Sequence, residues 1–226
     1  MKNNKKNLIL IPAVTRNPVL SFHMSEEERL SQLIGTIKTC IAKIPNSYVV
    51  VLEGGGENEN DKIRLLNEGA NEVFSYDLVR NGKRIPNPNR TKTYGELTLF
   101  LEYFSSTNFG DIKENVISIS KAGGRILLNE NFNFDPSENC VMNYTHTAWS
   151  GKGACSGRYW KIPISKFEHF HSRLSTLCKD YIKDESIIDI EHGLYKYNVI
   201  PLEGIEPNTL TGASLFVSTI GQWEHN

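Results

Sequence analysis

Residues 48–76 read YVVVLEGGGENENDKIRLLNEGANEVFSY and contain a strand, a helix and a second strand in that order. The β-branched run at 48–52 predicts the first strand, 61–69 a short helix and 72–76 the second strand. Two neighbouring strands joined through a helix run parallel, with a right-handed crossover. This unit therefore predicts an α/β fold built on a parallel sheet.

The residues before this unit extend the same alternation. An apolar run at 8–14 predicts a strand, and Ser25 followed by three acidic residues predicts the N-terminus of a helix. Apolar residues then recur at helical spacing up to Pro45. Strand, helix, strand, helix and strand in the first 80 residues indicate a mainly parallel sheet flanked by helices, an architecture typical of nucleotide-binding proteins.

The rest of the chain is less regular. Glycine, proline, asparagine and basic residues at 79–89 predict a loop that serves as a lid or wall. The other predicted segments are a helix at 95–104, a strand at 116–120, a long polar excursion at 129–157, an extended segment at 158–163, a helix at 164–181, and strands at 187–190 and 215–220. We expect one domain over 1–226, with the nucleotide-binding part at about 1–128 and an acceptor-side part at about 129–226.

Composition narrows the partners and the compartment. Lysine and arginine number 25 against 26 acidic residues, so no basic field favours nucleic acid, and a small molecule or carbohydrate fits better. The four cysteines form no CxxC pair, which favours free thiols in the cytoplasm. No apolar run approaches the roughly 20 residues of a transmembrane helix, and the short run at 8–14 contains Pro12, so it predicts a strand and not a signal peptide.

A second informative stretch, VISISKAGGRILLNENFNFD, spans residues 116–135. Its strand runs into Lys121, the pair Gly123-Gly124, and Arg125. Ligands of open α/β sheets lie outside the carboxyl ends of the strands, where a lysine and an arginine are able to hold a pyrophosphate. The alternative is an ordinary strand and glycine turn with two solvated surface cations.

Three motifs together resemble a known group of enzymes. They are TYGE at 93–96 before a leucine-rich helix, ISKAGGRILLNENFNFD at 119–135, and IEHGLY at 190–195 before a closing glycine-tryptophan segment. This combination is similar to small glycosyltransferases of bacterial surface-polysaccharide clusters and of large DNA viruses of algae. The resemblance implies a GT-A-like fold, a nucleotide-diphosphate sugar donor at the ends of the first four strands, a glycan or other hydroxyl acceptor, and a place in polysaccharide biosynthesis.

The resemblance also raises the question of a metal. In the GT-A fold a mid-chain strand ends in Asp-x-Asp, which holds a divalent ion on the diphosphate, whereas the matching strand here ends Ser118-Ile-Ser120-Lys121. Lys121 and Arg125 are able to replace the ion, because departure of the diphosphate needs only preorganised positive charge. The alternative keeps Mg²⁺ or Mn²⁺, with Asp135 or Asp77 among the ligands. We expect no metal-ligand set.

An inverting glycosyltransferase also needs a carboxylate that accepts the proton of the acceptor hydroxyl. The candidates are Glu96, Glu130, Asp135 and Glu191. Glu191 leads, because it follows a predicted strand and precedes His192, a residue type that often serves as a general acid or base. The alternative for Glu191 is an acidic residue in the first turn of a helix.

The nucleotide is assigned to the ends of the first and third strands. Thr15 and Arg16 follow the first strand, and Asp77 follows the third, where it is expected to contact the ribose or base. Further along the chain, Arg158, Tyr159 and Trp160 offer a cation and an aromatic platform for a sugar, or else belong to a strand buried in the core.

Two rival functions remain open. The glycines at 54–56, a helix, and Asp77 about 20 residues on are similar to the nucleoside-binding unit of an S-adenosylmethionine-dependent methyltransferase. Against this, the glycines run into the acid-rich stretch 57–61 and do not open a helix directly. The other rival is a non-catalytic carbohydrate-binding protein, which turnover would exclude.

Overall fold

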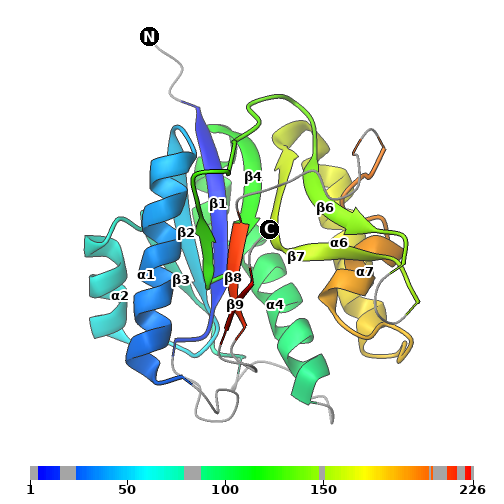
Figure 1. The fold of residues 1–226 in the computed structure, drawn as a ribbon, viewed down its shortest axis with the longest axis horizontal. Coiled ribbons are helices and arrows are strands. Elements are labelled where there is room, and N and C mark those ends of the chain that lie inside the picture. The colour runs from blue at the N-terminus through cyan, green and yellow to red at the C-terminus, as the bar shows by residue number, and fades with distance from the viewer. Residues whose placement is uncertain are drawn as a thin grey trace.

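The protein forms an α/β fold around a six-stranded mixed sheet whose order is β3-β2-β1-β4-β7-β6 (Figure 1). This is a computed structural model, and it describes residues 5–15, 24–78, 88–147, 151–203, 205, 213–217 and 222–224. Strands β3, β2, β1 and β4 are parallel, whereas β7 runs antiparallel to both β4 and β6. The expected mainly parallel sheet with flanking helices is confirmed.

The first five elements agree with the sequence prediction to within a few residues. They are β1 (Lys6–Ala13), α1 (Glu26–Lys43), β2 (Ser47–Glu53), α2 (Glu59–Asn67) and β3 (Glu72–Ser75). Each has a clear local signal. The N-terminus of α1, for example, is a capping box in which the hydroxyl of Ser25 accepts from the Glu28 amide and the Glu28 carboxylate accepts from the Ser25 amide.

The middle of the chain contains more helix than predicted. Helix α4 (Pro88–Phe104) begins seven residues before the expected start at 95, and α5 (Thr107–Lys113) follows it. The hydroxyl of Ser106 caps α5 by accepting from the Phe109 amide. Strand β4 (Val116–Ala122) includes Lys121, which the prediction placed just after the strand. Residues 79–87 of the predicted lid lie outside the described residues.

The predicted excursion at 129–157 is wrong in part, because it contains β6 (Val141–Thr145) and the start of β7 (Ala154–Pro163). These two strands pair with each other and extend the sheet beyond β4. The extended segment at 158–163 is confirmed as part of β7. The next helix is confirmed as the 3₁₀ turn Ile164–Lys166 followed by α6 (Phe167–Tyr181).

The predicted strand at 187–190 is wrong. Helix α7 (Ile190–Lys196) begins there, with Asp189 as its N-cap. Three isoleucines within four residues suggested a strand, but Ile187 and Ile190 are buried beneath α6 and α7 as core residues. Glu191 is therefore an acidic residue in the first turn of a helix, the alternative that the sequence left open.

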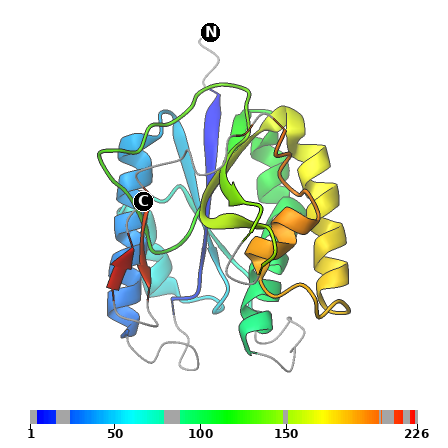
Figure 2. The ribbon, with the colours of Figure 1, turned by 45° about the vertical axis from the view of Figure 1, so that its right-hand side comes forward.

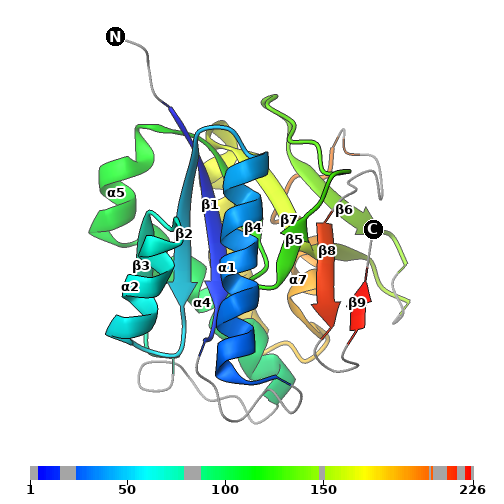
Figure 3. The ribbon, with the colours of Figure 1, turned by 60° about the vertical axis from the view of Figure 1, so that its left-hand side comes forward.

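A second, small sheet has the order β5-β8-β9 and consists of β5 (Ile126–Leu128), β8 (Ala213–Val217) and β9 (Gln222–Glu224). Its position beside α1 is visible in Figure 3. The strand predicted at 215–220 is thus confirmed for 215–217, whereas 218–220 lie outside the described residues.

Two hydrophobic cores cover the two faces of the main sheet. One packs α4, α6 and α7 against apolar residues such as Leu10, Ile119 and Trp160. The other packs α1, α2 and β5 against residues such as Ile11 and Val51. Figure 2 shows the layers, with α1 and the small sheet on one side and α6 and α7 on the other. Among the described residues, none of the helices combines the length and hydrophobicity that a membrane span requires.

Candidate functional site

The carboxyl ends of the four parallel strands meet at one edge of the main sheet, here called the carboxyl edge. The edge is formed by the ends of β1, β2, β3 and β4, and antiparallel β7 begins there. Ligands of open α/β sheets bind at this edge, at the point where the chain reverses its direction of strand addition. The chain adds β2 and β3 on one side of β1 and then adds β4 on the other side, so this point lies between β1 and β4.

Lys121 lies at this point and is almost completely buried. Its ammonium is 2.9 Å from Oε1 of Glu96 on α4, and the two side chains are only 5% and 16% exposed. It also donates a hydrogen bond to the backbone carbonyl of Gly157 in β7. Lys121 is therefore compensated within the protein, and is not a free surface cation.

Glu191 of α7 belongs to the same cluster. Its carboxylate packs so closely on β7 that a Cβ added at Gly157 would lie 2.1 Å from Oε1 of Glu191. Burial raises the pKa of Glu191, the positive charge of Lys121 opposes this shift, and the negative charges of Glu96 and Asp189 add to it. The sheet order thus joins Lys121, Glu96 and Glu191 into one buried charge cluster.

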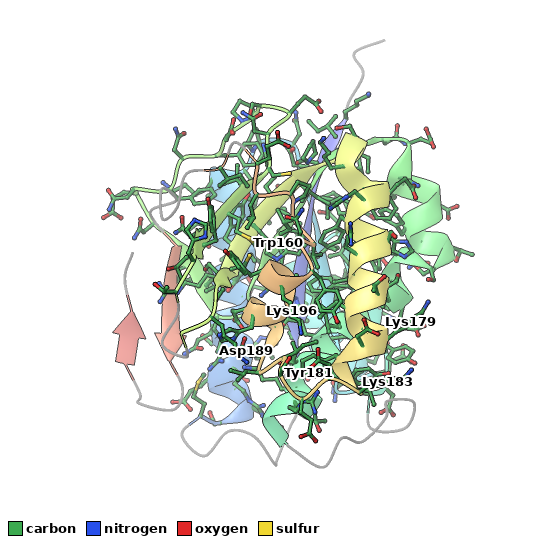
Figure 4. The ribbon with its side chains drawn as sticks, turned by 90° about the vertical axis from the view of Figure 1, so that its right-hand side faces the viewer. Trp160, Lys179, Tyr181, Lys183, Asp189 and Lys196 are labelled. Carbon is green, nitrogen blue, oxygen red and sulfur yellow. The ribbon has the colours of Figure 1, made fainter. Side chains whose placement is uncertain are left out.

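His192, the neighbour of Glu191, is held by the N-cap of its own helix. Nδ1 of His192 lies 2.5 Å from Oδ1 of Asp189, and the same oxygen accepts from the His192 amide at 2.9 Å. Figure 4 shows Asp189 at the start of α7, beside α6. His192 is 4% exposed, so we assign it to positioning the first turn of α7 and not to contact with a substrate.

On the opposite face of the sheet, Arg125 lies near Arg29 in the first turns of α1. Burial and the charge of Arg29 both lower the pKa of Arg125. Arg29 donates from Nη1 to the carbonyl of Val14 at 3.3 Å, while its buried Nε has no hydrogen-bond partner. Among the residues that the structure describes, neither arginine has a carboxylate partner. The pair therefore offers uncompensated positive charge at the end of β1.

Glu53, the last residue of β2, joins this part of the edge, although the sequence analysis did not select it. Its carboxylate accepts from the Thr15 amide at 3.1 and 3.2 Å and from the Gly55 amide at 2.7 Å. Burial raises the pKa of Glu53 to about 7, against the opposing effect of these hydrogen bonds. The sequence signal was an acidic residue ending the apolar run VVVL.

The residues predicted to hold the nucleotide lie along the same edge. The amide of Thr15 is bound to Glu53, and Arg16 lies outside the described residues. Asp77 follows β3 and lines a surface pocket of about 430 Å³ together with Glu57, Val73, Phe74, Ser75 and Asn108. Because β3 is three strands from β4, this pocket is roughly 14 Å from the Lys121 cluster.

Asp135 is not brought into the cluster. Its carboxylate accepts from the amide and hydroxyl of Ser137 in a turn, while its backbone carbonyl accepts from Lys161 at 2.5 Å. Lys161 is four residues along β7 from Gly157, a separation of roughly 13 Å in a strand. Asp135 therefore stabilises a turn on a different part of the sheet.

The aromatic pair in β7 is a core pair and not a platform. Tyr159 and Trp160 are 1% and 2% exposed and point into the two opposite cores. The hydroxyl of Tyr159 is 3.1 Å from that of Ser120. The alternative of a buried aromatic strand is the correct one.

The described residues do not fit a divalent metal site at the end of β4. The position of an acidic ligand is occupied by the ammonium of Lys121, and Ser120 faces Tyr159. Asp77 and Asp135, the two alternative ligands, lie far apart on the sheet. Across the described residues, no three histidine, cysteine or acidic side chains are grouped as metal ligands.

The glycine loop after β2 serves the fold. The amide of Gly54 donates to the carbonyl of Ala13, and that of Gly55 donates to Glu53. The methyltransferase alternative requires glycine amides that point at a ligand, whereas these two amides are bonded within the protein.

The chain matches no protein-family model and no curated protein sequence.

Proposed function

We propose that this protein is a cytoplasmic glycosyltransferase of GT-A-like architecture, which transfers a sugar from a nucleotide-diphosphate sugar to a hydroxyl of a glycan or other acceptor. One observation carries the proposal. The carboxyl edge places on one side of β4 an arginine pair that has no carboxylate partner among the described residues, and on the other side a half-buried carboxylate, Glu191. Sugar transfer from a diphosphate needs both groups, positive charge for the leaving group and a base for the acceptor.

Arg29 and Arg125 are the groups best placed for the diphosphate. A guanidinium binds phosphate oxygens in a planar, two-pronged geometry, and these two arginines have no carboxylate partner among the described residues. The nucleoside would then extend over the ends of β1 and β2 toward Thr15 and Asp77. Burial lowers the pKa of Arg125, but an arginine guanidinium stays protonated in proteins, so its charge is kept.

Glu191 is the proposed base. The acceptor oxygen attacks the anomeric carbon, its proton passes to the Glu191 carboxylate, and the bond from the anomeric carbon to the phosphate oxygen breaks. The nucleoside diphosphate leaves with that electron pair and is stabilised by the two arginines. Burial raises the pKa of Glu191 and so makes its carboxylate a stronger base. Turnover should consequently rise with pH through a midpoint above that of an ordinary glutamate.

The sequence analysis predicted that Lys121 binds the diphosphate, but here we propose another role for it. Its ammonium is already paired with Glu96, which makes it a positioning residue for the carboxylates beside it. A direct contact between Lys121 and the diphosphate stays a prediction. Measuring the affinity for the donor distinguishes this contact from a positioning role. Lys121→Ala should reduce turnover in either case, but it should weaken the donor strongly only if Lys121 contacts phosphate.

The deciding experiment is calorimetric titration of the full chain with a panel of nucleotide sugars and with S-adenosylmethionine. We expect one nucleotide sugar to bind, and Arg125→Ala and Arg29→Ala each to weaken it by roughly tenfold or more, the loss expected for a charge-assisted contact. Arg173→Ala, which removes an exposed arginine from α6, is the matched control. Binding of S-adenosylmethionine alone would favour the methyltransferase and reject the proposal.

Chelation tests the metal separately. Because the residues at the end of β4 do not fit a divalent ion, we expect EDTA to leave turnover unchanged. Complete loss of turnover that Mn²⁺ restores would show instead that a metal assists the diphosphate. Donor binding without turnover on any acceptor would support the non-catalytic carbohydrate-binding alternative.

A further inference from the structure

Glu191 and Tyr195 are one turn apart on α7 and lie on the same face of the helix. Both pack against glycines of the β7 region that are also four residues apart. A Cβ at Gly157 would lie 2.1 Å from Oε1 of Glu191, and a Cβ at Gly153 would lie 2.0 Å from the ring of Tyr195. The two glycines thus allow one face of α7 to pack a carboxylate and an aromatic ring against the β7 region, at two points four residues apart.

Tyr195 belongs to an aromatic cluster at the β6 edge. The ring of His146 lies 6.1 Å from that of Tyr195, and Nδ1 of His146 is 2.8 Å from the Tyr195 hydroxyl. Tyr144 lies under both rings, 5.5 Å from His146 and 6.4 Å from Tyr195, and its hydroxyl donates to the carbonyl of Ile205. Tyr144 is buried, Tyr195 is half-buried and His146 is exposed. Among the described residues, the cluster therefore runs from a buried ring to an exposed one.

We propose that Tyr195 and His146 form the acceptor subsite and bind a pyranose ring, so that the acceptor is a carbohydrate. This inference rests on the proposed function and names the acceptor class for the same site. A pyranose has a face of C–H groups with weakly positive hydrogens, which pack favourably against the negative face of an aromatic ring. Tyr195 and Glu191 lie on the same face of α7, so a glycan bound on Tyr195 would extend along this face toward the base.

The charge distribution supports this choice of occupant. The two lysines that neighbour Tyr195 and its packing glycine in sequence are bonded elsewhere, Lys152 to the carbonyl of Ser186 and Lys196 to the carboxylate of Asp184, so among the described residues no cation is directed at Tyr195. The polar atoms of Tyr195 and His146 lie at the rim, where they suit hydroxyl groups. A ligand of mixed C–H and hydroxyl character matches both properties.

NMR of the full chain with simple saccharides tests the subsite directly. Methyl α- and β-pyranosides of glucose and galactose serve as probes, and sorbitol serves as an open-chain polyol control that has hydroxyl groups but no pyranose ring. At least one pyranoside should shift the ring signals of Tyr195 and His146, whereas sorbitol should not. Absence of any pyranoside effect in the donor-loaded protein, or an equal effect of sorbitol, would overturn the proposal.

Variants assign the binding to the rings. Tyr195→Ala should weaken the pyranoside by about tenfold, and Tyr195→Phe, which keeps the ring, should retain most of the affinity. His146→Ala should weaken it less, and His169→Ala on α6 should not change it. Unchanged affinity in a folded Tyr195→Ala protein would overturn the proposal. If Tyr195→Ala does not fold, the comparison of His146→Ala with His169→Ala decides, and equal affinities there would overturn it.

The same samples separate this inference from the proposed function. Calorimetry with the nucleotide sugar reports on the arginine pair, which lies on the opposite face of the sheet from Tyr195. Donor binding without pyranoside binding would reject the subsite alone. Pyranoside binding that depends on Tyr195, without any donor binding, would retain the subsite and reject the transferase.

Discussion

At the scale of single residues, the most consequential finding is that Lys121 neutralises buried carboxylates. Replacing it with methionine would leave Glu96 and Glu191 facing each other without a cation. Breaking a buried ion pair costs about 3–5 kcal/mol of folding free energy, so we expect a loss of that size for Lys121→Met in urea unfolding at pH 8. The loss should shrink at pH 5, because burial raises the pKa of Glu191 and its carboxylate then takes up a proton more readily.

Two further variants test the cause of that loss. Lys121→Met combined with Glu96→Gln removes one charge of each sign and should recover much of the stability. Lys38→Met breaks the exposed pair between Lys38 and Glu68, which are 2.7 Å apart, and should have far less effect. A double variant no more stable than Lys121→Met would indicate lost packing as the cause.

Glu53 makes a prediction about pH. Its folded-state pKa of about 7 exceeds the ordinary value of 4.5, so the folded protein binds this proton more tightly than the unfolded chain. Stability should therefore fall as pH rises from about 4.5 to 7. Glu53→Gln should be more stable than the wild type at pH 8, by a few kcal/mol for a shift of this size, with the difference shrinking toward pH 5.

Urea unfolding at pH 5 and pH 8 measures this effect. The exposed residue Glu114 provides the control, since Glu114→Gln should leave the pH dependence of stability unchanged. If Glu53→Gln is destabilised equally at both pH values, the carboxylate is ionised in the folded state and contributes through its hydrogen bonds to Thr15 and Gly55.

At the scale of elements, the packing of α7 on β7 decides whether the cluster exists. Gly157→Ala places a methyl group against the carboxylate of Glu191, the end of a flexible side chain. We expect a small loss of stability but a large loss of turnover, because the base is displaced. Gly153→Ala places its methyl against the ring of Tyr195, which has less room to move, and should cost about 1–3 kcal/mol of stability.

Gly110→Ala is the matched control for both variants. No atom lies within 4 Å of a Cβ at Gly110 in α5, so this change should be neutral or stabilise the protein by about 0.5–1 kcal/mol. Normal turnover in Gly157→Ala would contradict the assignment of Glu191 as the base.

The elements also show what the sequence was able to predict. The first half has strong local signals, such as the Ser25 capping box and the uninterrupted run of β2, and those elements were predicted closely. The segment 187–190 misled because three isoleucines outweighed the N-cap at Asp189. An N-cap followed by a helix of only seven residues is a weak signal beside an apolar run that tertiary packing buries.

The candidate site was harder to predict, because its contacts depend on strand order. Lys121 and Arg125 were expected to hold the diphosphate together, but the ammonium of Lys121 is paired with Glu96 of α4, whereas Arg125, after the turn at Gly123, lies near Arg29 of α1, so only a ligand that lies across the carboxyl edge would contact both faces of the sheet. Glu96 reaches Lys121 only because α4 covers β4, and Glu191 only because antiparallel β7 lies next to β4. Neither relation is visible in residue spacing.

At the scale of the whole molecule, the two hydrophobic cores share one sheet, so we expect them to unfold together. Cys40 reports on the α1 side and Cys178 on the α6 side, and both thiols are buried. Variants that retain one of these cysteines, with the other three replaced by alanine, allow thiol labelling in urea to report on each side separately. Because β1 and β4 contribute side chains to both cores, labelling of Cys40 and of Cys178 should give the same free energy of opening. Labelling of Cys178 at clearly lower urea would mean that α6 and α7 detach first, and the charge cluster would then be lost while the arginine side of the sheet stays folded.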